Sequence, residues 1–164
     1  MGSYDDKSQS EAIPEPLQFD RREVMQFVGL AMFYAQCLEG NLVWLATLLS
    51  LDERLTEEAL THGSFEHQMK TLGQLVRTCE NRFRELGAIE ARHPDTGNTI
   101  FEDLREALQV RNSLIHGFFV CHKENYLTES GRRTMLKELC AKCSILKERN
   151  ELVKSFVTLL GESM

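Results

Sequence analysis

The chain has 164 residues, of which 42% are hydrophobic and 27% are charged, a length and composition typical of one soluble domain with its own core. Its formal net charge of −6 argues against a protein that coats nucleic acid, since that affinity comes mostly from basic side chains on phosphates. No stretch approaches the roughly 20 consecutive apolar residues of a membrane span, so the sequence predicts no membrane partner.

Helical periodicity runs through most of the chain. Only 3 prolines and 10 glycines are present, and the apolar residues recur at spacings of three and four, as on one face of a helix. Residues 1–18 are polar and are expected to form a flexible tail, and residues 19–164 a single helical domain. The predicted fold class is all-α, with a bundle of four or five helices.

The first predicted helix starts at an N-cap, Asp20, with Glu23 three residues later as in a capping box. It runs to about Leu51. Gly29 and Gly40 interrupt its apolar pattern and indicate a close helix contact or a bend.

Residues 52–64 are predicted to form a connection that contains at most a short helical turn. Ser64 is then expected to cap a second helix, because serine is a favoured N-cap residue. The apolar positions that follow Ser64 carry this helix to about Leu86.

Two more helices are predicted in the second half of the chain. A turn cluster within residues 91–98 precedes the third helix, which starts near Thr99. Gly117 is a residue where this helix could loosen or stop. The fourth helix follows residues 128–131 and continues to about Leu160.

The most informative segment is residues 111–116, RNSLIH, late in the third predicted helix. At 100° per residue, Arg111 falls near the centre of an apolar stripe, where the pattern predicts leucine. Asn112 and His116 are four residues apart and share the polar border of that stripe. Arg105 lies on the same polar border.

These residue types suit phosphodiester chemistry. His116 would remove a proton from a ribose 2′-hydroxyl or donate one to the leaving oxygen. Arg111 would stabilise the charge of the transition state, and Asn112 would hold the imidazole or the phosphate. This chemistry requires no metal and no cofactor. RNA cleavage needs a general acid and a general base, and one histidine supplies only one of the two. A homodimer is therefore part of the hypothesis.

A structural interpretation of Arg111 competes with the catalytic one. An unpaired buried charge is costly, so Arg111 could instead pair with a carboxylate inside the bundle. Glu39, on or near the apolar face of the first helix, is the candidate partner, although a solvent-facing glutamate is the commoner case. Arg132, Arg133 and Lys137 form a modest basic patch that could contact RNA phosphates, although a solvated helix face is the commoner case.

At residues 111–116 the sequence resembles the HEPN superfamily of small helical bundles. Many members carry an arginine, four to six intervening residues and a histidine, with Asn, Asp or His often directly after the arginine. The resemblance implies a dimer whose paired motifs share a cleft and cut RNA without metal. It also implies roles in toxin–antitoxin modules, phage defence or RNA processing, with an antitoxin or regulatory protein as a further partner.

The resemblance has a departure and an alternative. Toxins paired with a nucleotidyltransferase antitoxin often have Tyr two residues after the histidine, where this chain has Phe118. Many superfamily members also lack activity. A non-catalytic binding or regulatory helical module is therefore the alternative function.

The remaining candidates have ordinary explanations. Cys140 and Cys143 form a CxxC pair that Cys121 and the adjoining histidine could complete as a zinc site, but the pair lies in a helical pattern, where cysteine is often a small buried hydrophobe. The five cysteines and the lack of a visible secretory signal indicate reduced thiols and a cytoplasmic location.

Histidines outside the motif and the single tryptophan are given structural roles. His62, His67 and His93 fall in or beside predicted loops and are expected to be exposed polar residues. Trp44 lies on the first predicted helix and is expected to belong to the core.

Overall fold

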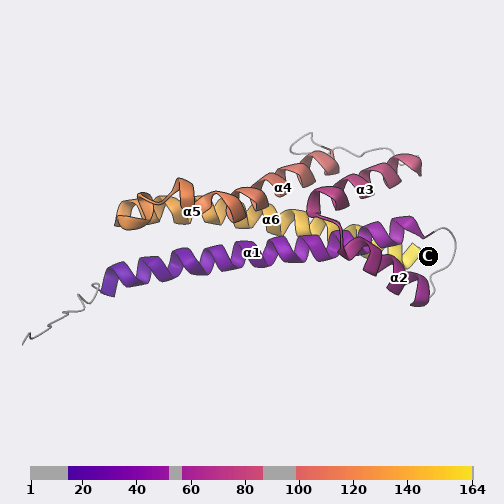
Figure 1. The fold of residues 1–164 in the computed structure, drawn as a ribbon, viewed down its shortest axis with the longest axis horizontal. Helices are drawn as coiled ribbons and strands as arrows, with labels where there is room; N and C mark the ends of the chain where they lie inside the picture. The colour runs from indigo at the N-terminus through magenta and orange to yellow at the C-terminus, as the bar shows by residue number, and fades with distance from the viewer. Residues whose placement is uncertain (1–14, 52–56, 87–98, 164) are drawn as a thin grey trace, which may run out of the picture.

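The computed structural model describes residues 15–51, 57–86 and 99–163. Within these ranges the chain is helical, which confirms the all-α fold class, and the helices pack into a bundle (Figure 1). The elements, in chain order, are α1 (Glu15–Ser50), α2 (Glu57–Gln68), α3 (Leu72–Glu85), α4 (Ile100–His116), α5 (Phe118–Cys121), the 3-10 helix η1 (Asn125–Leu127) and α6 (Glu129–Ser163).

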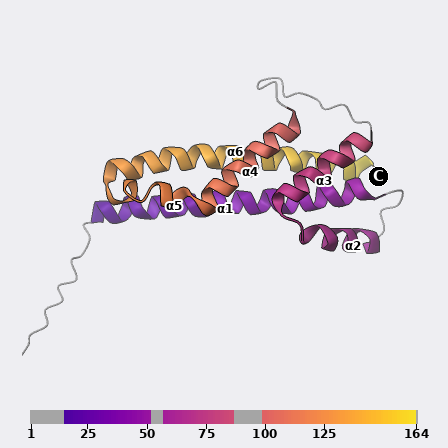
Figure 2. The same cartoon turned by 45° about the horizontal axis from the view of Figure 1, so that its top comes forward.

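Helices α1 and α6 lie side by side and run in the same direction along the molecule (Figures 1 and 2). Two polar contacts fix their alignment. The Cys143 thiol donates to the Phe27 carbonyl oxygen over 3.6 Å, and Asn41 Nδ2 donates to Asn150 Oδ1 over 2.8 Å. The intervening helices return the chain to the start of α6, with α3 and α4 over one half of this pair and α2 beside the end of α1 (Figure 2).

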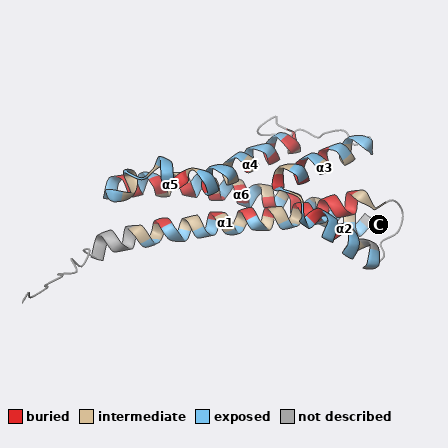
Figure 3. Cartoon of the chain, viewed as in Figure 1, coloured by how far each residue is buried: buried red, intermediate tan, exposed pale blue. Residues whose placement is uncertain are grey.

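The core lies between α1, α3, α4 and α6, and buried residues occupy the facing sides of these helices (Figure 3). Burying a leucine or phenylalanine side chain contributes about 1.5–3 kcal/mol, so this cluster supplies most of the folding free energy. Its largest fully buried apolar members are Leu38, Leu42, Leu45, Leu75, Phe101, Leu104, Met135, Leu139 and Leu146.

Trp44 is not part of this core, which corrects the sequence-based expectation. The side chain is 45% exposed. The stripe through Leu38, Leu42 and Leu45 sets the buried face of α1, and at 100° per residue Trp44 falls well outside it.

The start of α1 also differs from the prediction. The helix begins at Glu15, so Asp20 lies inside it and is not its N-cap, and the last four residues of the predicted tail belong to the helix. Residues 1–14 lie outside the described residues. A Cβ atom added at Gly29 or Gly40 would meet nothing within 4 Å, so neither glycine marks a close helix contact.

The second predicted helix is divided into α2 and α3, and α2 already begins at Glu57, so residues 57–64 are helical rather than part of the predicted connection. Ser64 is a buried residue inside α2 rather than an N-cap. Thr71 caps α3 instead: its hydroxyl accepts from the Gln74 backbone N–H over 3.4 Å, and Gln74 Oε1 accepts from the Thr71 N–H over 2.8 Å. This reciprocal capping box begins a new helix at a point where the apolar pattern by itself predicts one continuous helix.

The boundaries of α4 agree with the prediction. The Thr99 hydroxyl accepts from the Glu102 N–H over 3.2 Å, and Glu102 Oε2 accepts from the Thr99 N–H over 2.6 Å. Gly117 follows the last residue of α4, and its N–H donates to the Ser113 carbonyl over 3.1 Å. The turn cluster predicted within residues 91–98 lies outside the described residues.

Gly131, in the first turn of α6, is required by a close backbone contact. A Cβ atom there would overlap the carbonyl oxygen and Cα of Asn125 in η1. We therefore expect Gly131→Ala to lower the free energy of unfolding by about 1–3 kcal/mol, the usual cost of overpacking, as measured by urea denaturation. The control is Gly40→Ala, where open space leaves only the gain in helix propensity of up to about 1 kcal/mol. Equal effects of the two substitutions would contradict this contact.

Candidate functional site

The predicted motif lies at the carboxyl end of α4. Asn112 and His116 are exposed and Arg111 is half-buried. Arg111 is therefore at the edge of the buried face rather than at its centre, because the face that packs into the bundle is rotated away from Ile115, which is 40% exposed. The buried apolar residues of α4 are Phe101, Leu104, Ala107 and Leu114.

Arg111 contacts its neighbour in the motif. Its Nη1 donates to Asn112 Oδ1 over 3.2 Å, so Asn112 holds the guanidinium rather than the imidazole. Within the described part of the chain no ion pair joins Arg111 to a carboxylate, and Glu39, a half-buried residue of α1, does not pair with it. The Glu39–Arg111 pair, the less favoured of the two interpretations of Glu39, is therefore not formed. Since Arg111 is not deep in the bundle, it does not require an internal counter-ion.

A polar chain of contacts fastens the end of α4 to α6. Lys142 Nζ donates to Ser113 Oγ over 2.9 Å and lies 3.3 Å from Glu138. The other Glu138 oxygen is 2.9 Å from Nε2 of His122, whose Nδ1 is 2.8 Å from the Phe118 carbonyl oxygen. The members of this set come from separate parts of the chain and are brought together only by packing, so no sequence pattern predicts the set. It holds the segment that carries the motif in place.

Arg105, a predicted supporting residue, belongs to a different contact. Its Nη2 lies 2.6 Å from Oε1 of Glu80, a buried carboxylate of α3 that Arg84 also contacts over 2.7 Å. Arg105 is six residues from Arg111, which places it about 120° around the helix. The structure therefore does not bring these two arginines together.

The predicted basic patch at the start of α6 is smaller than expected. Arg132 is fully buried, and its Nη1 donates to the Tyr126 carbonyl oxygen over 3.0 Å. It supports the segment before α6 and cannot reach an RNA phosphate at the surface, so its predicted role is wrong. Arg133 is exposed at the surface, where it lies 2.6 Å from Glu129.

The cysteines differ in exposure. Cys121 and Cys140 are exposed and Cys143 is buried, and burial raises the pKa of the Cys143 thiol. Across residues 15–51, 57–86 and 99–163, no group of three His, Cys, Asp or Glu side chains could hold a metal ion. The same residues contain no helix with the length and apolar character needed to cross a membrane.

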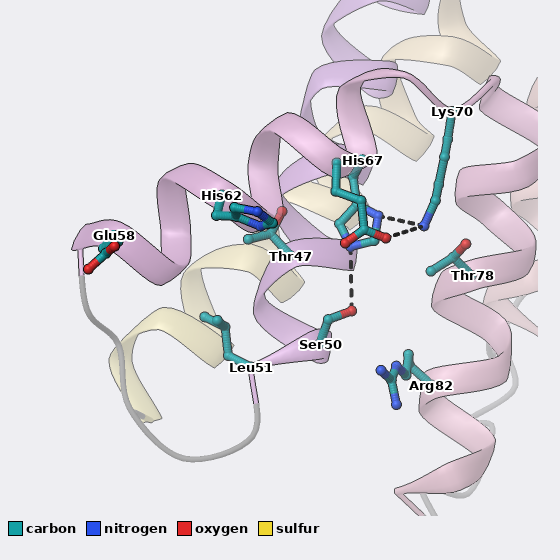
Figure 4. A pocket seen from close by; sticks show the side chains of 11 residues that line it. Thr47, Ser50, Leu51, Glu58, His62, His67, Lys70, Thr78 and Arg82 are labelled. Carbon is teal, nitrogen blue, oxygen red and sulfur yellow. Dashed lines mark hydrogen bonds and ion pairs between the residues drawn. The ribbon is translucent and has the colours of Figure 1, made fainter.

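A second candidate site is a polar cavity of about 630 Å³ between the end of α1, α2 and α3 (Figure 4). His67 reaches it from α2 and is buried, contrary to the prediction that it is exposed. The apolar pattern could not reveal this burial, because the surrounding wall is itself polar. The cavity is lined by Thr47, Ser50, Leu51, Glu58, His62, Gly63, Glu66, His67, Lys70, Thr78 and Arg82.

The contacts of His67 assign its tautomer. Lys70 Nζ is 2.8 Å from His67 Nδ1, and an ammonium only donates, so Nδ1 accepts. The Ser50 hydroxyl donates to the Ala46 carbonyl over 2.7 Å and lies 3.4 Å from His67 Nε2, so Nε2 carries the proton. Burial, together with the Lys70 charge, lowers the pKa of His67. In this tautomer Nε2 is a donor and not a base toward Ser50.

Comparison of the chain with protein-family models, with curated proteins and with solved structures found no match.

The depressed pKa of His67 predicts a pH dependence of stability. The unfolded chain takes up a proton at this histidine as pH falls through about 6.5, while the folded chain keeps it neutral to lower pH. The free energy of unfolding should therefore fall below pH 6.5 by up to about 1.4 kcal/mol per pH unit from this residue. In urea titrations between pH 7 and 5.5, His67→Gln should show a shallower loss than the wild type.

The matched control is His62→Gln, which removes an exposed histidine from the same helix and should keep the wild-type slope. If the free energy of unfolding of His67→Gln fell with pH as steeply as that of the wild type, the pKa of His67 would be the same in the folded and the unfolded chain.

Proposed function

We propose that this protein is a metal-independent endoribonuclease of the HEPN type, with a composite site formed by the motifs of two copies. One observation carries the proposal: Arg111 and His116 lie on the solvent-accessible end of α4, and Arg111 pairs with no carboxylate among the described residues. An arginine locked in an internal salt bridge or a histidine buried in the bundle would favour the non-catalytic alternative, whereas among the described residues Arg111 has no carboxylate partner and His116 is exposed.

The reaction follows from the two imidazoles of a dimer. His116 of one copy takes the proton of a ribose 2′-hydroxyl as its oxygen attacks the phosphorus. The bond from phosphorus to the 5′-oxygen breaks, and His116 of the other copy donates a proton to that oxygen. The products are a 2′,3′-cyclic phosphate and a 5′-hydroxyl end, so no metal or water is consumed in this step.

Arg111 would stabilise the negative charge that develops on the phosphoryl oxygens. The contact from its Nη1 to Asn112 Oδ1 restrains the guanidinium, which lowers the entropy lost when it binds a phosphate. Asn112 is therefore a positioning residue for Arg111.

The surface beside His116 supports a second copy as the partner. Ile115, Phe119 and Val120 are 40%, 38% and 73% exposed, and they lie within four residues of His116 in the sequence, on either side of the break at Gly117. Exposed apolar side chains close to a charged motif are candidates for a contact surface. A partner seated there would cover these side chains and bring a second imidazole to the site. A toxin or defence role, with an antitoxin or other regulatory partner, follows only from the same resemblance.

Replacing His116 tests the catalytic role. We expect His116→Ala to lower cleavage of a mixed RNA in EDTA by about 100-fold or more, the usual contribution of a general acid or base, with the helical circular dichroism spectrum unchanged. His62→Ala, an exposed histidine of α2, is the matched control and should cleave like the wild type. Equal cleavage by His116→Ala would leave the non-catalytic binding module as the function.

A charge on the apolar surface tests the composite site. Val120→Asp should shift the protein from dimer to monomer in sedimentation velocity and should lower RNA cleavage in parallel, because burying an unpaired carboxylate is costly. Met69→Asp places the same charge at a site that is 81% exposed, far along the chain, and should change neither. Full cleavage by a monomeric wild type would refute the composite site.

A further inference from the structure

The cavity between α1, α2 and α3 has the form of a ligand site rather than a packing defect. Its volume of about 630 Å³ lies within the roughly 300–1,000 Å³ range of small-molecule sites. A closed helix interface would be filled by apolar side chains, whereas most side chains that line this cavity carry hydroxyl, imidazole, carboxylate or cationic groups.

Two cations and a hydroxyl face the cavity from one side. Thr78 and Arg82 are four residues apart on α3 and share a face of that helix, and Lys70 stands between α2 and α3. Figure 4 shows Thr78 and Arg82 on the α3 side of the space, across from Ser50, with the Lys70 side chain reaching His67 above them.

His67 keeps the Lys70 ammonium directed into the cavity. The unprotonated Nδ1 accepts from Lys70 Nζ over 2.8 Å, and a neutral imidazole adds no positive charge that would repel the lysine. Lys70 keeps other donors, because an ammonium has three.

The carboxylates that contact the two cations are exposed, and one of them, Glu85, lies outside the cavity lining. Glu66 lies 3.7 Å from Lys70 Nζ and its side chain is 65% exposed. Glu85 lies 2.8 Å from Arg82 Nη1 and is 61% exposed. Exposed ion pairs contribute little free energy, so an anion in the cavity can replace them.

We propose that this cavity binds the phosphate group of a small phosphate ester, held by Lys70 and Arg82, with the Thr78 hydroxyl as a further donor. Charge-assisted hydrogen bonds from lysine and arginine are the strongest that a phosphate receives in proteins. The part of the cavity beyond these three side chains accommodates the organic portion. This site is separate from the proposed ribonuclease motif and does not depend on it.

Isothermal titration calorimetry on the full chain tests the site with two probes, inorganic phosphate and AMP, at constant ionic strength. Both should bind saturably. Arg82→Gln and Lys70→Gln should each weaken binding by about tenfold or more, as expected for loss of a hydrogen bond to a charged group. Arg77→Gln removes the same charge from the same helix outside the cavity and should bind like the wild type.

Two further controls distinguish loss of binding at this cavity from an effect of the ribonuclease motif and from misfolding of a variant. Arg111→Gln should retain phosphate and AMP binding, and thermal denaturation should show that each variant is folded. The proposal is overturned if neither probe binds saturably below about 10 mM. It is equally overturned if Arg82→Gln and Arg77→Gln bind alike, or if binding is lost in Arg111→Gln.

Discussion

The parallel packing of α1 against α6 is the constraint on which the rest of the structure depends. Leu38 and Leu42 of α1, with Leu139 and Leu146 of α6, are fully buried, and Asn41 bonded to Asn150 over 2.8 Å fixes the alignment of the helices. Because parallel neighbours cannot be joined by a short turn, the chain must return before α6 starts. Helices α2, α3 and α4 make that return, and both candidate sites are built on it.

The buried and the exposed arginines have different roles. Arg132 is fully buried and supports the segment before α6 through the Tyr126 carbonyl. Arg149, largely buried, lies 3.4 Å from Asp103, which is itself buried. These guanidinium groups hold helices together, so they are unavailable to a substrate. Arg111 and Arg82 lie at the margins of the bundle, where no core contact depends on them and chemistry can use them.

Local signals predicted some helix boundaries and misplaced others. The start of α4 near Thr99 was predictable because a turn-forming segment precedes it and an apolar pattern follows. The capping box at Thr71 was missed, since apolar residues continue at helical spacing across it, from Phe65 through Met69 to Leu72. Asp20 and Ser64 are good N-cap residues that lie inside helices. A cap residue marks a helix start only where the backbone is free to leave the helix, and packing decides that.

The sequence by itself determined the helical class, the extent of α4 and α6, and the spacing of Arg111, Asn112 and His116 on one helix, because helical geometry follows from local backbone preference. Only the tertiary structure decided which arginines are buried and whether Glu39 pairs with Arg111. It also decided that His67 lines a cavity together with Lys70 and Arg82. These outcomes depend on how each helix is rotated against its neighbours. That rotation is set by the summed burial of many side chains, which no short segment of the chain contains.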